Sequence, residues 1–159
     1  MKRLALFVLA LAAAVNADYD ADLDVKDVND LAGRFETDVA TIKGCLDEAG
    51  TTIVELVEAR KKWKNMQDTD EIDEETKAVF LKHNTFIACM LEKKEMMKDS
   101  KLVLDKILEV LQNDKDLKNP PTKEVLTECV TTLNENSEMS REDRAVGLVL
   151  CVSSEEDER

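Results

Sequence analysis

The cysteines of this chain constrain its fold more than any other feature of its sequence. There are four among 159 residues, Cys45, Cys89, Cys129 and Cys151. They lack the close spacing of a structural zinc site, and the chain offers only one histidine, His83, to complete such a site. A cysteine nucleophile is disfavoured too, because it needs a basic partner and a reducing compartment. We therefore expect no metal ligands among the cysteines. Whether they form disulfide bonds depends on the redox compartment of the protein.

The first 17 residues, MKRLALFVLALAAAVNA, have the composition of a secretory signal peptide. Lys2 and Arg3 precede an unbroken apolar run over residues 4–15, and small side chains at Val15 and Ala17 precede the expected cleavage point. The run is shorter than the roughly 20 residues that span a bilayer. We expect a secreted, extracellular domain over residues 18–159, with no stable membrane insertion.

An even number of cysteines in a secreted chain indicates two disulfide bonds, and four cysteines can pair in three ways. The residues alone do not choose among the three. The net charge of −13 and the lack of basic patches argue against nucleic acid as a partner. Nor is there a phosphate-binding glycine loop or a serine triad, so we expect neither an enzyme nor a cofactor. The alternating aspartates at 18–24 lack the glycine and glutamate of an EF-hand calcium loop.

Between the cysteines the chain is expected to be almost all helix, since it has only four glycines and two prolines and no sustained period-two alternation. About six helices are predicted. The first begins at Val28 and is ended by a left-handed cap at Gly50. A capping box from Thr52 to Glu55 opens the second, which runs to Trp63. The third covers residues 74–92, and a break at 98–100 leads to the fourth at 101–112.

The C-terminal third of the chain is predicted to hold the last two helices. Paired prolines mark a loop, and Pro121 is placed in the first turn of the fifth helix, which carries Cys129. Ser140 to Asp143 resembles a capping box and starts a sixth helix that ends near Cys151. Residues 153–159, SSEEDER, are expected to form a solvated acidic tail. Residues 18–159 would thus form a single all-α domain.

Three cysteine-bearing stretches carry a resemblance to a known family. They are GCLDEAG around Cys45, ACMLEKK around Cys89 and VLTECV around Cys129. Behind a signal peptide and within six helices, they resemble an insect odorant-binding protein of the pheromone and general odorant-binding family. ACMLEKKEMMKDSKLVLDKILEVLQ resembles the third-to-fourth helix region of that family closely, and the resemblance covers essentially the whole mature chain. Members usually carry six cysteines. Thr85 and Glu142 stand here at the second and fifth places, so the chain resembles the four-cysteine "minus-C" branch.

The resemblance also implies which cysteines pair. Family pairing carried onto these positions gives Cys45–Cys89, joining the first helix to the third, and Cys129–Cys151, joining the fifth to the sixth. The interval between the first two cysteines is longer than in many members, largely because of the acidic segment QDTDEIDEE. The missing third bridge implies a helical shell that opens more easily than in six-cysteine relatives.

The function that the resemblance implies is carriage of a small hydrophobic ligand in an internal apolar cavity of a compact bundle. The ligand would be an odorant, a pheromone or another lipophilic semiochemical. An alternative is a secreted haemolymph, venom or saliva protein of the same fold that acts through a protein partner or by general lipid scavenging. A membrane chemoreceptor and a second copy of the chain are further candidate partners. The candidate ligand-binding residues lie on apolar helix stripes: Leu56, Trp63, Phe80, His83, Phe86, Met90, Met97, Leu104, Leu108, Leu111, Leu126, Val130, Leu133 and Leu148.

Two of these residues carry more specific expectations. His83 shares a helix stripe with Val79, Phe86 and Met90, so it is expected to face inward and to be neutral near pH 7. Acidification would then force a charge into the apolar shell and favour opening, although protonation of the many carboxylates is a competing acid trigger. Trp63, the only tryptophan, is expected near the pocket, with simple packing as the alternative.

Overall fold

The computed structural model describes residues 28–66, 71–113 and 120–157. The expected signal peptide, the aspartates at 18–24 and residues 67–70 of the acidic segment lie outside these ranges. The described residues form seven helices and one two-stranded hairpin. The elements are α2 Val28–Phe35, α3 Val39–Ala49, α4 Ile53–Asn65, α5 Glu74–Lys93, β1 Met97–Lys98, β2 Lys101–Leu102, α6 Leu104–Gln112, α7 Lys123–Glu135 and α8 Arg141–Asp157. The predicted all-α class is confirmed.

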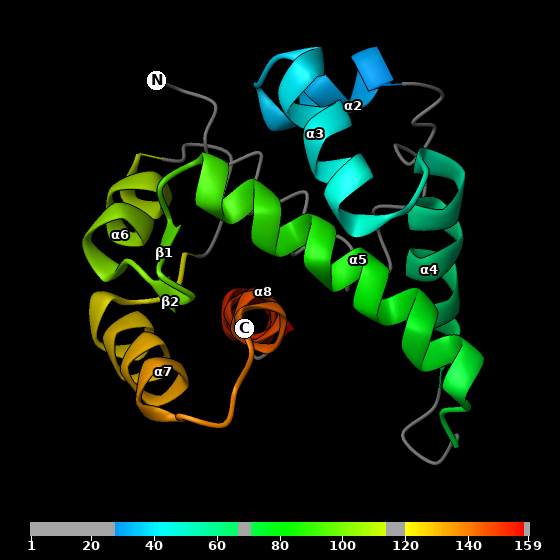
Figure 1. The fold of residues 1–159 in the computed structure, drawn as a ribbon. Helices are drawn as coiled ribbons and strands as arrows, with labels where there is room; N and C mark the ends of the chain where they lie inside the picture. Colours follow the sequence, from blue (N-terminus) through cyan, green and yellow to red (C-terminus); the bar gives the residue numbers. More distant parts are fainter. Residues whose placement is uncertain (1–27, 67–70, 114–119, 158–159) are drawn as a thin grey trace.

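Helix α5 is the centre of the arrangement (Figure 1). It crosses the molecule diagonally, with α2, α3 and α4 on one side and the hairpin, α6 and α7 on the other. Helix α8 packs against α5 and α7 and is seen end-on in this view. Six consecutive residues of α5, 86–91, are apolar and buried, so this part of the helix is covered on every side. A helix buried all round must be surrounded by other elements, which accounts for its central place.

The predicted first helix is in fact two helices, α2 and α3. The chain breaks at Glu36, whose φ of 48° is left-handed, and Asp38 then caps α3 by accepting a hydrogen bond of 2.6 Å from the backbone N–H of Thr41. Aspartate is a favoured N-cap because its carboxylate satisfies an amide that has no partner within the helix. The apolar spacing concealed the break, since both helices turn apolar side chains such as Phe35 and Ile42 toward one core.

The helix ends that depend on local chemistry agree with prediction. Gly50 ends α3 with φ 62° and ψ 40°, the left-handed conformation that glycine adopts at low cost. Thr52 and Glu55 form the predicted capping box, and α4 extends two residues beyond Trp63. The side chains of Ser140 and Asp143 exchange hydrogen bonds with each other's backbone N–H groups at the start of α8.

A β-hairpin occupies the place of the predicted break and of the start of the predicted fourth helix. Met97 pairs with Leu102, and the turn residues Asp99 and Ser100 have φ of 52° and 62°. Two consecutive left-handed residues form the tight turn that suits a two-residue hairpin. The side-chain amide of Asn134 in α7 holds the second strand by bonding both the N–H and the C=O of Leu102, each at 2.9 Å. Helix α6 therefore begins at Leu104 rather than at residue 101.

Two predicted boundaries near the C-terminus are wrong. Pro121 does not lie in the first turn of α7, because Thr122 is the N-cap and Pro121 precedes it. The threonine hydroxyl accepts a hydrogen bond from the N–H of Val125 and so fixes the start of the helix. Helix α8 does not end near Cys151 but continues to Asp157, so most of the predicted acidic tail is helical.

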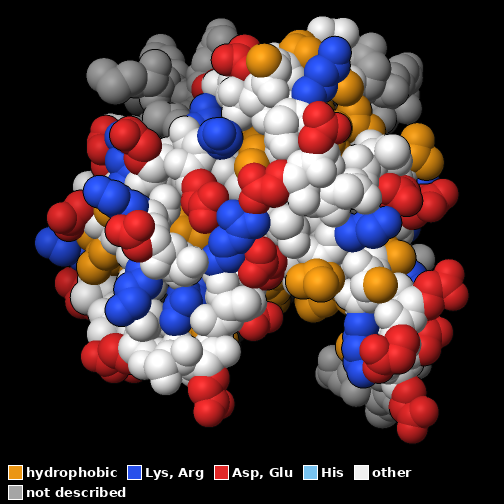
Figure 2. Space-filling view, in the orientation of Figure 1, with side chains coloured by type: hydrophobic (Ala, Val, Ile, Leu, Met, Phe, Trp, Pro, Cys, Tyr) orange, Lys and Arg blue, Asp and Glu red, His pale blue; other side chains and the backbone are white. Residues whose placement is uncertain are grey.

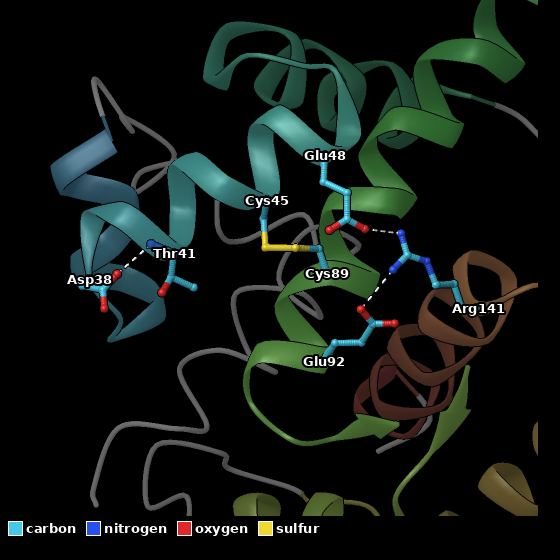
Figure 3. The surroundings of a disulfide bond; sticks show 7 residues. All are labelled: Asp38, Thr41, Cys45, Glu48, Cys89, Glu92 and Arg141. Atoms are coloured by element: carbon cyan, nitrogen blue, oxygen red, sulfur yellow. Dashed lines mark hydrogen bonds and ion pairs between the residues drawn. A yellow bond between two sulfur atoms is a disulfide. The ribbon is translucent and has the colours of Figure 1, made fainter. Parts of the chain in front are cut away.

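Both predicted disulfides are present, and each joins two helices. Cys45–Cys89 links α3 to α5 with a Cα–Cα distance of 5.6 Å, and Cys129–Cys151 links α7 to α8 at 6.5 Å. Figure 3 shows the first bridge between the two helices. The cysteines of the described ranges are all bonded.

The junction of α7, α8 and the hairpin is held by Arg144, which is almost fully buried. Its guanidinium donates to three backbone carbonyls, those of Leu133 at 2.9 Å, Ser100 at 2.9 Å and Asn136 at 2.6 Å. Ser100 lies in the hairpin turn, and Asn136 caps α7, where its carbonyl also accepts the backbone N–H of Met139 at 3.4 Å. The dipoles of the three carbonyls stabilise the buried charge of Arg144.

Candidate binding pocket

An apolar pocket in the described part of the molecule lies between α4, α5 and α8. It comprises about 460 Å³ of atom-free volume, part of which opens to solvent. The wall is mostly apolar, and its polar members are Arg60, His83 and Asn84. Ligand sites commonly have this composition, an apolar lining with a few polar groups that orient the ligand. The full lining is Ala59, Arg60, Trp63, Phe80, His83, Asn84, Ile87, Val146, Val149 and Leu150.

A second space shares part of its lining with the first. It lies between α2, α4 and α5, has about 360 Å³ of atom-free volume, and is lined by Leu31, Ile53, Leu56, Val57, Arg60, His83, Phe86 and Ile87. Arg60, His83 and Ile87 belong to both linings. These three side chains therefore border both apolar spaces.

His83 has the most perturbed environment in the pocket. Burial is the main cause that lowers the pKa of its imidazole from 6.5 to about 4, and the positive charge of Arg60 lowers it further. A contact of 3.4 Å between the ring Nδ1 and the side-chain oxygen of Asn84 acts in the opposite direction. The expected inward-facing, neutral histidine at pH 7 agrees with this environment.

Two aromatic rings form the outer end of the pocket. Trp63 at the end of α4 and Phe80 in α5 meet edge to face, with ring centroids 5.1 Å apart. Phe80 is buried, whereas Trp63 is 38% exposed. The indole therefore lies where the pocket meets solvent.

An open groove adjoins this end of the pocket. It shares Trp63, Asn84, Val146 and Leu150 with the pocket wall and adds polar residues from the start of α8 and the turn before it, including Asn136, Glu138 and Asp143. Figure 2 shows the surface hollowed between the part that covers α7 and α8 and the part that covers α4 and α5. The groove and the pocket therefore share part of one wall.

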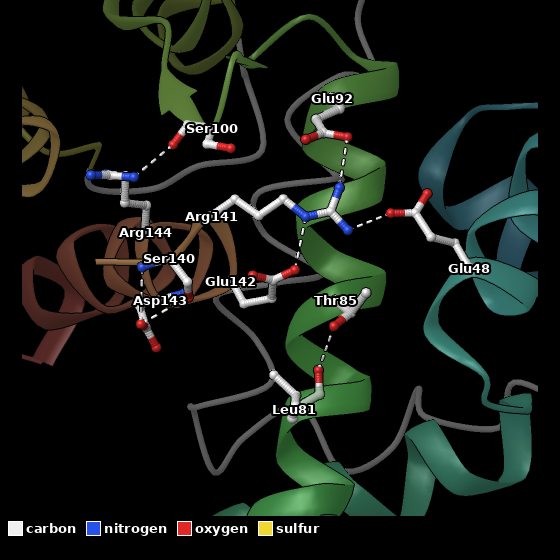
Figure 4. A network of polar contacts seen from close by, with 10 residues as sticks. All are labelled: Glu48, Leu81, Thr85, Glu92, Ser100, Ser140, Arg141, Glu142, Asp143 and Arg144. Carbon is white, nitrogen blue, oxygen red and sulfur yellow. Dashed lines mark hydrogen bonds and ion pairs between the residues drawn. The ribbon is translucent and has the colours of Figure 1, made fainter. Parts of the chain in front are cut away.

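A polar cluster at the start of α8 includes Glu142, one of the two positions that the family resemblance assigns to the missing third bridge. Arg141 at the start of α8 pairs with Glu48 of α3, with Glu92 of α5 at 3.0 Å and with its neighbour Glu142 at 2.8 Å. Figure 4 shows the guanidinium between the three carboxylates, with Thr85 on the facing side of α5. The Thr85 hydroxyl donates to the carbonyl of Leu81 within its own helix. We call Arg141, Glu48, Glu92 and Glu142 the Arg141 cluster; it connects three helices without a covalent bond.

Five of the predicted ligand-binding residues line these spaces, and they are Leu56, Trp63, Phe80, His83 and Phe86. The others pack in or against the hydrophobic core, where a ligand role stays a prediction: Met90, Met97, Leu104, Leu108, Leu111, Leu126, Val130, Leu133 and Leu148. Sequence reasoning missed seven residues that line the first pocket, namely Ala59, Arg60, Asn84, Ile87, Val146, Val149 and Leu150. Ile87 lies on the predicted third helix and Val149 on the sixth, so their helical spacing was a usable signal. Arg60 gave no such signal, because an arginine in a helix is normally expected on the surface.

The described residues form an all-α protein whose helices are linked by two disulfides. The sequence model of the PBP/GOBP family matches residues 39–155, so the chain belongs to the PBP/GOBP family. Members of this family are binding proteins for small hydrophobic ligands rather than enzymes. No curated protein and no solved structure matches the chain.

Two further observations concern residues 28–66, 71–113 and 120–157 only. In these ranges no group of three or more His, Cys, Asp or Glu side chains is placed to hold a metal ion. No helix there combines the length and the apolar character that crossing a membrane requires.

Proposed function

We propose that this chain is a secreted carrier that binds an odorant, a pheromone or another lipophilic semiochemical in the pocket between α4, α5 and α8. The observation that carries the proposal is the apolar pocket with a groove at its outer end, in a chain of the PBP/GOBP family. The N-terminal 17 residues support secretion by their composition.

The space now open in the pocket suits only a small molecule. Arg60, His83 and Ile87 border both apolar spaces, so movement of these side chains would change the volume of both. Two disulfides in place of three leave α5 and α8 joined only by noncovalent contacts, among them the Arg141 cluster. A ligand can therefore spread this side of the bundle more readily than a third bridge would permit.

The test is displacement of a neutral naphthylamine dye by medium-chain alcohols, aldehydes and esters, with the mature chain after removal of any tag. Val146→Phe places a larger ring on a wall shared by the pocket and the groove and is expected to reduce dye affinity at least tenfold. Val54→Phe is the matched control, because Val54 is 66% exposed on α4 and lines neither space. Equal affinities of the two variants would place the ligand elsewhere.

A further inference from the structure

The two ring nitrogens of His83 differ in their hydrogen bonding. Nδ1 lies 3.4 Å from the side-chain oxygen of Asn84, its neighbour in α5. Arg60 acts on the ring through its positive charge and not through a hydrogen bond. In the part of the chain that the structure describes, no group donates to the second nitrogen, Nε2.

The contact with Asn84 determines which nitrogen carries the proton. Burial lowers the pKa of the imidazole to about 4, so the ring is neutral at pH 7 and has one N–H donor and one acceptor nitrogen. An unprotonated Nδ1 would set its lone pair against the side-chain oxygen of Asn84, whereas a protonated Nδ1 donates to that oxygen. The proton therefore lies on Nδ1, and Nε2 is a hydrogen-bond acceptor.

This acceptor belongs to the wall of the candidate binding site, because His83 lines both apolar spaces. In an imidazole Nδ1 is bonded to Cγ, whereas Nε2 lies at the end of the ring farthest from the backbone. The far end of the ring is the part that a lining side chain brings nearest to a ligand. A buried acceptor without a donor is unfavourable, and a ligand that supplies the donor removes that penalty.

We propose that His83 selects ligands with a hydroxyl group, which donates its hydrogen to Nε2 while the apolar tail packs against side chains such as Phe80 and Ile87. The inference rests on the proposed function and specifies the ligand class of the same site. An alcohol has the required donor, whereas an ether, an ester or an aldehyde has oxygen acceptors only. Such ligands would leave Nε2 unpaired, and a site that pairs with a hydroxyl discriminates against analogues that lack it.

Asn84 acts as a positioning residue for this selection. Its side-chain oxygen holds the proton on Nδ1 and so keeps Nε2 as an acceptor. Without that oxygen the proton can move to Nε2, which would then donate to an ether oxygen as readily as Nε2 accepted from a hydroxyl. Removal of the Asn84 amide should therefore weaken the preference for alcohols while leaving the imidazole in place.

The experiment compares octan-1-ol with its isomer 1-methoxyheptane as displacers of the neutral dye at pH 7.4. Selectivity is the dissociation constant of the ether divided by that of the alcohol. His83→Phe should lower the selectivity about 3- to 10-fold, the usual range for one neutral hydrogen bond, and Asn84→Leu should lower it less. Phe80→Leu is the matched control, since it alters the apolar wall of the same pocket and should change both affinities by a similar factor. Unchanged selectivity in His83→Phe or in Asn84→Leu would overturn the inference.

A second measurement needs no variant and so does not depend on whether His83→Phe folds. His83 is the only histidine of the sequence, so its ring ¹⁵N signals in a tag-free sample are unambiguous in NMR. The free protein should show the proton on Nδ1, and saturating octan-1-ol should shift the Nε2 signal as expected for an accepted hydrogen bond, whereas 1-methoxyheptane should not.

The outcomes separate this inference from the proposed function. A proton on Nε2 in the free protein, or the same Nε2 shift with both ligands, would overturn the inference while leaving the carrier intact. Failure of both ligands, and of the aldehydes and esters, to displace the dye would instead overturn the proposed function.

Discussion

The Arg141 cluster gives the most direct test of how this bundle is held together without a third bridge. Arg141→Met removes the guanidinium while keeping an unbranched side chain on the start of α8. The Arg141 side chain is 23% exposed, and those of Glu142, Glu92 and Glu48 are 17%, 34% and 41% exposed. The pKa of Arg141 is raised above its usual value by the hydrogen bonds to these carboxylates, although its partial burial acts in the opposite direction.

The expected cost follows from these exposures. The Glu48 pair is the most exposed and contributes at most about 0.5 kcal/mol, whereas the Glu92 and Glu142 pairs are partly shielded from solvent and contribute up to about 1 kcal/mol each. Removal of the cation also leaves three carboxylates close together, which adds repulsion. We expect Arg141→Met to lower the free energy of unfolding by about 2 kcal/mol at low salt.

Urea denaturation in 50 mM and in 500 mM sodium chloride measures this cost and its salt dependence. The difference from the wild type should shrink at high salt, because the exposed part of the interaction is screened. Lys77→Met is the control: its pair with Glu74 joins side chains that are 57% and 89% exposed, so its loss should cost no more than about 0.5 kcal/mol. If Arg141→Met costs no more than this control, the cluster does not hold α8 to α3 and α5.

Three further predictions concern the packing and the pocket. An added Cβ at Gly147 would lie 2.5 Å from Cδ2 of Leu133, whereas at Gly44 it would meet nothing within 4 Å. Thermal unfolding should therefore show Gly147→Ala destabilised by about 1–2 kcal/mol and Gly44→Ala stabilised by about 0.5–1 kcal/mol. A change in stability of the same sign for both variants would contradict the packing of α7 on α8. The folded-state pKa of His83, about 4, lies below its usual 6.5, so the unfolded state takes up the proton first as pH falls. Between pH 6.5 and 4 the free energy of unfolding of the wild type should fall by up to about 3 kcal/mol more than that of His83→Gln. If the two proteins have the same dependence of stability on pH, the carboxylates alone respond to acid. Because Trp63 is the only tryptophan and lies at the pocket mouth, saturating ligand should change the intrinsic fluorescence, and an unchanged spectrum would remove it from the binding site.

The parts of this fold that the sequence predicted are those determined by neighbouring residues. Gly50 and the pair Thr52 and Glu55 act within a single helix turn, so their positions alone predicted the helix ends. The break at Asp38 also had a local signal, an N-cap residue directly before an apolar helix, but the continuous apolar spacing favoured one long helix. The disulfide pairing came from the family resemblance, since the cysteines by themselves left three choices.

The missed features depend on residues far apart in the chain. The hairpin at 97–102 is held by Asn134, which is 32 positions away from Leu102. No pattern in the sequence around Asn134 predicts this contact. The wall formed by Val146 and Leu150 depends on how α8 docks against α5, and both residues look like ordinary helix positions in isolation. Arg60 was missed because burial of an arginine beside a pocket is a tertiary property.

The contacts of Arg144 have a consequence for the order in which the chain folds. Two of its three carbonyl partners are only 11 and 8 residues away, and the disulfide between the same two helices spans 22 residues, half the 44 spanned by Cys45–Cys89. Each doubling of loop length adds about 0.6 kcal/mol to the entropy cost of closure. The α7–α8 hairpin therefore forms from nearly local contacts, and we expect Cys129–Cys151 to be the first bridge to accumulate during oxidative refolding. The pocket wall on α8 would then exist before α3, α4 and α5 assemble against it.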